Sequence, residues 1–184
     1  IGEVYDEDRA HRIAAERNWI VKPDGPYWRR VVGSPAPCEV RETRLIKLLL
    51  DSGAEVVCAG GGGVPVIRND ARKLEGVEAV VDKDHTAAVL AESLEADALL
   101  ILTDVTNVFH DYATPNQVPI TRSTPQAIRA EQFPAGSMGP KVDAACRFVE
   151  QTGGVAGIGR LQDATQILAG TAGTTIAAAG QLDE

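Results

Sequence analysis

Three consecutive charged residues, Asp82, Lys83 and Asp84, separate a small apolar run from an alanine-rich run that has the pattern of a helix. A lysine in such a position can neutralise a bound phosphate, and a carboxylate beside it can hold the ammonium group in place. The same residues also permit a purely structural role, because Asp84 could cap a helix that begins at His85 while Lys83 points into water. The stretch therefore predicts either a helix cap or a charged group placed over a binding site.

A second lysine, Lys141, lies in the first turn of a predicted helix over residues 140–154, which begins at Pro140 and ends at two glycines. A cation in the first turn opposes the helix dipole, so a purely structural role is disfavoured and a bound anion is indicated. Residues 102–105, Leu-Thr-Asp-Val, close another apolar strand with polar side chains, which on their own could form only a turn.

Four glycines, Gly60, Gly61, Gly62 and Gly63, directly follow the apolar run at 54–59. Glycine permits positive φ angles and lets backbone N–H groups approach an anion closely. The spacing matches neither the Walker loop nor the dinucleotide-binding fingerprint, and a mobile loop is the alternative. Together with the two lysines, the glycines indicate phosphoryl transfer, which depends on neutralising charge on the transferring oxygens.

Alternating apolar strands and helices occupy the chain from Arg41 onward and would position these residues. We predict strands at 54–59, 77–81, 98–103, 155–159 and 174–179, and helices at 41–53, 85–94, 140–154 and 161–170. This alternation is typical of an α/β fold with a mostly parallel sheet that is covered by helices on both faces. Ligands of such sheets bind beyond the carboxyl ends of the strands, where the lysines and glycines fall.

The N-terminal residues have a different pattern and predict a separate small subdomain. A helix is predicted at 6–17 and a β-hairpin from strands at 19–22 and 29–32, before the Ser-Pro-Ala-Pro break at 34–37. We therefore divide the chain into a protruding subdomain over residues 1–37 and an α/β domain over residues 38–184.

The composition is that of a soluble globular protein, with 44% hydrophobic and 24% charged residues in a chain of 184. The net charge of −8 argues against general nucleic-acid binding, and no apolar run approaches the roughly 20 residues that a membrane helix needs. The widely spaced Cys38, Cys58 and Cys146 predict reduced core thiols in a cytoplasmic protein. The three histidines do not share ligand spacing with these cysteines, so no transition-metal site is predicted.

Seven stretches of the sequence, in their order along the chain, closely resemble the carbamate kinases of the amino acid kinase superfamily. They are YWRRVVGSPAP, AGGGGVPVI, GVEAVVDKDHTAAVLA, ADALLILTDV, TPNQ, GSMGPKVDAACRFVE and LAGTAGT. The match extends over essentially all 184 residues, but it covers only the later part of that family's chain and lacks the N-terminal segment with its substrate loops.

The resemblance implies a three-layer αβα sandwich that catalyses reversible phosphoryl transfer with Mg²⁺: carbamoyl phosphate + ADP ⇌ carbamate + ATP. It further implies a homodimer that acts in arginine metabolism. The implied partners are these small molecules, and neither nucleic acid nor a membrane is among them.

The resemblance also assigns roles to particular residues. It implies that Lys83 and Lys141 neutralise the transferring phosphoryl group and that Asp84 orients both lysines. Residues 1–37 would cover the carbamate side, Gly60–Gly63 would face the phosphoryl groups, and residues 38–184 would bind the nucleotide, with no metal ligand from the protein. The residues implied to contact the nucleotide are Thr103, Asp104, Val105, Tyr112, Met138 and Pro140.

The sequence departs from the family pattern without changing a charged catalytic position. The departures are Gly33 in place of a proline, the polar pair His85-Thr86, and an exchanged order of Phe109 and Tyr112.

Two alternative functions stay open. A related kinase acting on an amino acid or a nucleoside monophosphate is disfavoured by residues 29–35 and 136–141, whereas a nucleotide-binding remnant without turnover is favoured by the missing N-terminal segment.

Overall fold

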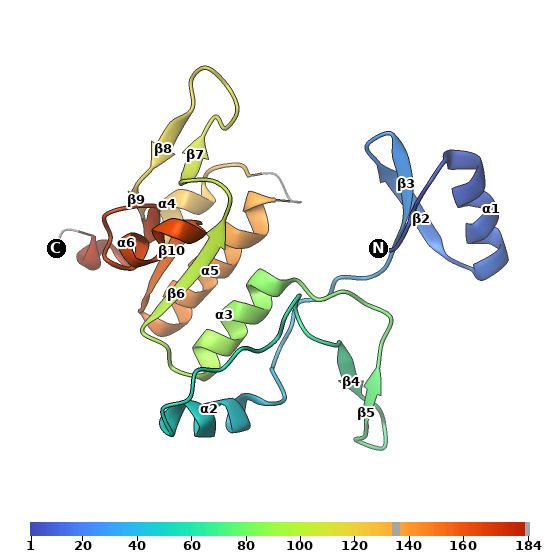
Figure 1. Ribbon diagram of the computed structural model, residues 1–184, viewed down its shortest axis with the longest axis horizontal. Helices are drawn as coiled ribbons and strands as arrows, with labels where there is room; N and C mark the ends of the chain where they lie inside the picture. The colour runs from blue at the N-terminus through green and yellow to red at the C-terminus, as the bar shows by residue number, and fades with distance from the viewer. Residues whose placement is uncertain (134–136, 183–184) are drawn as a thin grey trace. The chain divides into compact units, whose positions relative to one another are not determined.

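The computed structural model describes residues 1–133 and 137–182 (Figure 1). The chain divides into two compact units, Ile1–Pro35 with Val64–Val81 and Ala36–Gly63 with Asp82–Glu184. The first unit thus contains a second segment, Val64–Val81, in addition to the N-terminal residues. None of the helices in the described ranges is long and apolar enough to cross a membrane.

The first unit is built from one helix and two small sheets. Helix α1 (Glu7–Arg17) begins after Asp6, whose carboxylate accepts a hydrogen bond of 2.8 Å from the Arg9 backbone N–H. One sheet has the strand order β1-β3-β2 and consists of β1 (Val4–Tyr5), β2 (Ile20–Asp24) and β3 (Tyr27–Val31). The other sheet is a hairpin of β4 (Val66–Arg68) and β5 (Leu74–Gly76). The predicted helix and first hairpin are confirmed.

The predicted strand at 77–81 is wrong. In that run only Ala79 makes a ladder contact, an isolated bridge to Gly33. The β4–β5 hairpin ends just before it, at Gly76, so the apolar run continues as an irregular connection to the next helix. An apolar composition favours a strand only where a neighbouring strand accepts its backbone hydrogen bonds.

The second unit contains a four-stranded sheet in the order β6-β10-β11-β9. Its strands are β6 (Ala98–Thr103), β9 (Arg122–Ser123), β10 (Val155–Arg160) and β11 (Thr174–Ile176). Two of the three pairings, β6 with β10 and β9 with β11, are parallel, and only β10 with β11 is antiparallel. The expectation of a mostly parallel sheet is confirmed, although β11 ends three residues earlier than predicted.

Helices cover both faces of this sheet, so the α/β class with three layers is confirmed (Figure 1). Its helical segments are α2 (Thr43–Asp51), α3 (Lys83–Ser93), α4 (Pro125–Arg129), α5 (Met138–Thr152), η1 (Leu161–Asp163), α6 (Ala164–Leu168) and η2 (Ala179–Gln181). On the α6 face, a Cβ added at Gly159 would lie 2.7 Å from Ile167 Cδ1, so glycine permits the close approach. The hairpin β7 (Val108–His110) and β8 (Val118–Ile120) and helix α4 were not predicted.

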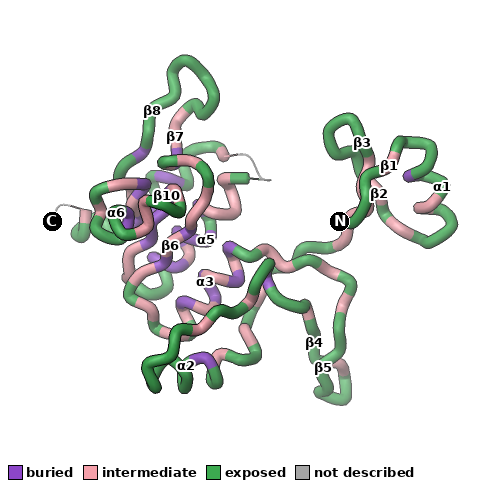
Figure 2. Tube along the Cα trace, in the orientation of Figure 1, coloured by how far each residue is buried: buried purple, intermediate pink, exposed green. Residues whose placement is uncertain are grey.

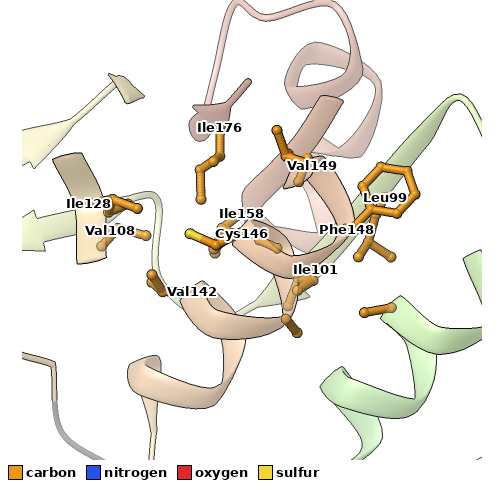
Figure 3. Close-up of a cluster of buried hydrophobic side chains, with 14 of the residues drawn as sticks. Leu99, Ile101, Val108, Ile128, Val142, Cys146, Phe148, Val149, Ile158 and Ile176 are labelled. Atoms are coloured by element: carbon orange, nitrogen blue, oxygen red, sulfur yellow. The ribbon is translucent and has the colours of Figure 1, made fainter. Parts of the chain in front are cut away.

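The core lies between α5, α3 and the facing side of the sheet (Figures 2 and 3). Side chains at helical spacing on α5, including Val142, Cys146 and Val149, pack against Ile101 and Ile158 of the central strands. The core is mostly aliphatic, as the low aromatic content of the sequence indicates. This packing fixes α3 and α5 side by side, with both of their N-termini close to the carboxyl end of β6.

The segment 54–59, predicted as a buried strand, forms no strand. Val57 is fully exposed, and Leu45 and Leu48 of the preceding helix α2 are also exposed. No described strand pairs with this segment, and its backbone makes only local turn hydrogen bonds, such as those from Ala54 N–H to Leu49 and from Gly60 N–H to Cys58. The prediction of a buried strand at 54–59 is therefore wrong.

The expectation of core thiols holds for Cys146 alone, since Cys38 and Cys58 are exposed. Burial raises the pKa of the Cys146 thiol to about 11, because the charged thiolate would lose its hydration. At pH 8, we expect a disulfide reagent such as Ellman's reagent to modify Cys38 and Cys58 rapidly and Cys146 only after denaturant is added. Rapid modification of all three thiols in the folded protein would contradict the packing of Cys146.

Candidate active site

A cavity of about 340 Å³ opens in the second unit at the carboxyl end of β6, beside the first turns of α3 and α5. Its lining includes residues that the sequence singled out from four separate segments: Lys83, Asp84, Thr103, Asp104, Val105, Tyr112, Met138, Pro140 and Lys141. The carboxyl-end location follows the general rule for parallel sheets. Asn107, Phe133 and Ser137 also line the cavity, and no role was predicted for them.

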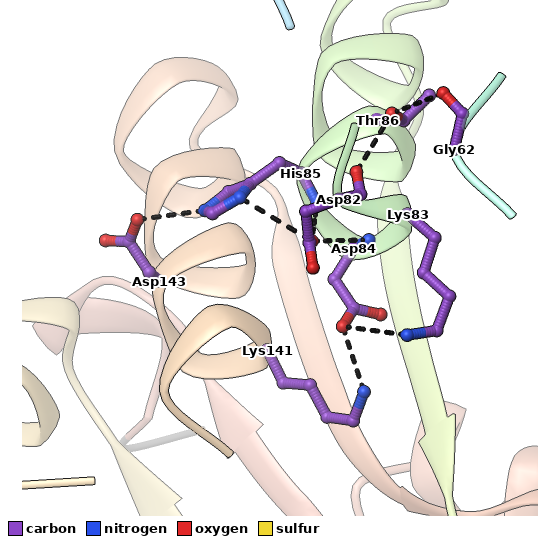
Figure 4. A network of polar contacts seen from close by, with 8 residues as sticks. All are labelled: Gly62, Asp82, Lys83, Asp84, His85, Thr86, Lys141 and Asp143. Carbon is purple, nitrogen blue, oxygen red and sulfur yellow. Dashed lines mark hydrogen bonds and ion pairs between the residues drawn. The ribbon is translucent and has the colours of Figure 1, made fainter. Parts of the chain in front are cut away.

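Asp84 joins the two lysines (Figure 4). The Lys141 Nζ donates a hydrogen bond of 2.9 Å to Asp84 Oδ2, and the Lys83 Nζ lies 3.6 Å from the same oxygen. The Asp84 and Lys141 side chains are 10% and 14% exposed, whereas that of Lys83 is 58% exposed. One carboxylate therefore holds the mostly covered ammonium group of Lys141 firmly and leaves the exposed one of Lys83 free to reach into the cavity.

The helix cap beside these residues is Asp82, so the alternative that Asp84 caps a helix starting at His85 is wrong. Helix α3 begins at Lys83, and Asp82 Oδ1 accepts hydrogen bonds from the backbone N–H groups of Asp84 at 2.9 Å and His85 at 3.0 Å. The extended backbone of Asp82, with φ −69° and ψ 130°, suits the cap position. Because Asp82 satisfies the cap, the Asp84 side chain is free to point toward Lys141.

Helix α5 begins at Met138, two residues before the predicted start at Pro140. Pro140 is tolerated at the third position because the first four N–H groups of a helix have no intrahelical acceptor. Ser137, the cap residue, makes no side-chain cap bond, so the backbone N–H groups of the first turn are available to a ligand. Gly136, the first residue of the predicted stretch 136–141, lies outside the described residues.

The glycine segment lies next to α3 but does not line the cavity. Gly60, Gly62 and Gly63 have positive φ angles of 49°, 129° and 89°, which fits the expected use of glycine. The buried Thr86 hydroxyl lies 3.0 Å from the carbonyl oxygens of both Gly62 and Asp82, to which it donates. The segment is thus tied to the first turn of α3, while its predicted position after a buried strand is wrong.

The arrangement can neutralise an anion that carries several charges. Two ammonium groups and the N-termini of α3 and α5 meet at one end of the sheet, where the helix dipoles also favour negative charge. Thr103 and Asp104 add polar side chains at the carboxyl end of β6, and Phe109 and Tyr112 add aromatic rings with centroids 5.9 Å apart. The cavity therefore combines a charged end suited to phosphates with an apolar wall suited to a flat ring.

The amino-acid sequence of this chain is similar to those of known proteins. The model of the amino acid kinase family matches residues 8–158. The chain is 49% identical over 176 residues to carbamate kinase from Haemophilus influenzae and 45% identical over 181 residues to carbamate kinase from Pyrococcus furiosus. Each match covers 96% of this chain and 57% of the relative, so the chain spans little more than half the length of these relatives.

The fold agrees with a solved structure of the same kind. Carbamate kinase from Giardia lamblia bound to AMP-PNP superposes with a TM-score of 0.87 at 39% sequence identity. That match covers 96% of this chain and 58% of the Giardia chain. The arrangement of the helices and the sheet is therefore shared with a protein that carries a nucleotide analogue.

Proposed function

Because this chain belongs to the amino acid kinase family, we propose that it forms the nucleotide-binding and phosphoryl-transfer part of a carbamate kinase. The observation that carries the proposal is the sharing of one Asp84 carboxylate oxygen by Lys83 and Lys141 at the cavity. The proposed reaction is carbamoyl phosphate + ADP ⇌ carbamate + ATP. Identities of 42–49% to carbamate kinases from several organisms support this acceptor over a nucleoside monophosphate.

The proposed chemistry is electrostatic. In the direction of ATP formation, a β-phosphate oxygen of ADP bonds to the phosphorus of carbamoyl phosphate, while the bond from that phosphorus to the carbamate oxygen breaks. Lys83 and Lys141 neutralise the oxygens of the moving phosphoryl group, whose transfer requires little covalent help from the protein. Asp84 fixes the positions of both ammonium groups and offsets their mutual repulsion.

We propose that the nucleotide lies along the remaining wall of the cavity. Thr103, Asp104 and Val105 would contact it at the end of β6, with Tyr112, Met138 and Pro140 as further contacts. The volume of about 340 Å³ lies within the range of roughly 300–1,000 Å³ that is usual for small-molecule sites. The AMP-PNP complex of the Giardia relative supports nucleotide binding in general.

Mg²⁺ is proposed to enter as a complex with the nucleotide phosphates and not as a resident ion. Asp84 is already paired with two lysines, and the described residues contain no group of three or more His, Cys, Asp or Glu side chains that could hold a metal. Magnesium commonly keeps several waters and binds chiefly through substrate phosphates in such sites.

We also propose roles for the glycine segment and for the two parts into which the sequence divides the chain. Gly60–Gly63 would face the phosphoryl groups, supported by their positive φ angles and by the Thr86–Gly62 hydrogen bond beside Asp84. Residues 1–37 would cover the carbamate side and residues 38–184 would hold the nucleotide. The active form would be a cytoplasmic homodimer.

Calorimetry tests nucleotide binding directly, and we expect ADP with Mg²⁺ to bind these 184 residues. Lys47→Ala is the matched control, because Lys47 pairs with Glu95, which follows α3, and does not line the cavity. The absence of a binding heat from the folded protein at millimolar ADP would contradict the nucleotide site.

An assay of ATP formation from carbamoyl phosphate and ADP then separates the alternatives. Transfer from carbamoyl phosphate to ADP, and in the reverse direction from ATP to carbamate but not to an amino acid or a nucleoside monophosphate, is the expected result in the natural protein that carries these residues. Binding without any transfer would favour the non-catalytic alternative, which the coverage of only 57% of the relatives keeps open.

A further inference from the structure

We infer that His85 is a positioning residue, whose protonated ring cross-links the first turns of α3 and α5 and thereby holds Lys141 in register with Asp84. The effect on turnover rests on the proposed function, whereas the cross-link itself rests on the ion pairs alone. His85 does not line the cavity, so it acts through the residues that do.

The His85 ring lies between two carboxylates (Figure 4). Its Nε2 is 3.1 Å from Asp143 Oδ2, on α5, and its Nδ1 is 3.5 Å from Asp82 Oδ1, the oxygen that caps α3. The ring is only 24% exposed. It therefore connects the cap of one helix to the first two turns of the other.

The protonation state of the ring decides how many of these contacts are attractive. A neutral imidazole has one N–H donor and one lone pair, so it can donate to only one carboxylate and must present its lone pair to the other. An imidazolium donates through both nitrogens. The complete cross-link between Asp82 and Asp143 therefore exists only when His85 carries a proton.

Charged groups around the ring belong to three helices. Arg129 of α4 holds the other oxygen of Asp143, with Nη2 at 3.1 Å from Oδ1, and its Nη1 also pairs with Glu150. These contacts orient Asp143 toward His85. The other titratable residues on these parts of the two helices are Lys83 and Asp84 on α3 and Lys141, Cys146 and Arg147 on α5. Arg147 pairs with Glu92 on α3.

Two links now run in parallel between the first turns of α3 and α5. The Asp84–Lys141 hydrogen bond of 2.9 Å is a single side-chain contact between these turns. Core packing and the Arg147–Glu92 pair already hold the two helices side by side, and the His85–Asp143 contact of 3.1 Å, one residue further on α3 and two on α5, adds a second side-chain link close to Lys141. Loss of the His85 link should therefore displace the Lys141 ammonium group without removing it.

The kinetic test compares the wild type with His85→Gln from pH 5.5 to 8.5. At pH 6 we expect kcat of the variant to be on the order of tenfold lower, because small misplacements of a catalytic group are costly, with KM for ADP changed by less than about twofold. The ratio of the two kcat values should move toward one as the pH rises to 8.5, because the neutral ring keeps at most one of its two contacts. His85→Lys stays charged over this range, so its own kcat should lack the transition that the wild type shows. His11→Gln, an exposed histidine beside one carboxylate, is the control.

A second readout does not depend on turnover. In NMR spectra without nucleotide, the Lys141 Cε resonance should move with pH at the midpoint of His85 in the wild type and should lose that transition in His85→Gln. Lys47, paired with Glu95 at 3.1 Å, serves as the matched lysine. The inference is overturned if the Lys141 resonance shows no transition that depends on His85, or if the ratio of the wild-type kcat to the His85→Gln kcat does not change with pH. Absence of transfer in the wild type, with the NMR coupling intact, would overturn the proposed function alone.

Discussion

Replacing Lys141 by alanine should lower kcat for phosphoryl transfer by a factor on the order of a hundred or more, while ADP binding weakens far less. The Lys141 ammonium group is 14% exposed and sits 2.9 Å from Asp84, so water cannot easily replace the lost charge. An interaction made mainly in the transition state appears in kcat and not in uniform binding. Steady-state kinetics and ADP calorimetry on the same sample measure the two effects separately.

A loss of folding must be distinguished from a loss of chemistry in this variant. Alanine leaves the buried Asp84 carboxylate with Lys83 as its remaining partner at 3.6 Å, which costs stability. Lys141→Gln retains a hydrogen-bond donor without the charge and provides the second measurement, with thermal unfolding as the check. A folded variant that keeps more than half of the wild-type kcat would exclude Lys141 from the reaction.

Asp84→Asn should reduce turnover nearly as much as the lysine change, with little effect on the melting temperature. The amide preserves the shape of the side chain but removes the negative charge that holds two ammonium groups at 2.9 and 3.6 Å. Without that charge, the lysines repel each other and lose their fixed positions. The measurement is kcat together with thermal unfolding.

Asp82→Ala provides the contrasting variant, because Asp82 and not Asp84 caps α3. Loss of the cap should cost about 1 kcal/mol of unfolding free energy, and turnover should fall much less than in Asp84→Asn. If Asp84→Asn turns over at a near-normal rate, the carboxylate does not organise the lysines.

The sequence predicted best the elements whose patterns are local. The helical spacing of α3 and α5 and the continuous apolar runs of β6 and β10 are set by residues within each element, and all four were found. The runs at 54–59 and 77–81 were misjudged because strand formation depends on a partner strand. Composition does not reveal that partner.

The candidate site was predictable for two different reasons. The carboxyl-end rule for parallel sheets indicated where Lys83 and Lys141 would meet, and the family resemblance supplied the individual contacts such as Tyr112. The contacts of His85 could not be predicted, since its partner Asp143 lies 58 residues away along the chain and no motif connects the two. Asp82 was misjudged because two aspartates separated by one residue compete for a single cap position.

The exposed leucines of α2 have a consequence for how these residues behave at high concentration. Leu45 and Leu48 are 56% and 65% exposed, and the adjacent extended segment presents a fully exposed Val57. Apolar side chains next to unpaired backbone N–H groups favour association between copies, by burial and by strand pairing together. Colloidal stability, and not folding, should therefore limit the concentration at which the 184 residues remain monodisperse. A polar substitution such as Leu48→Gln should raise that limit without touching the cavity.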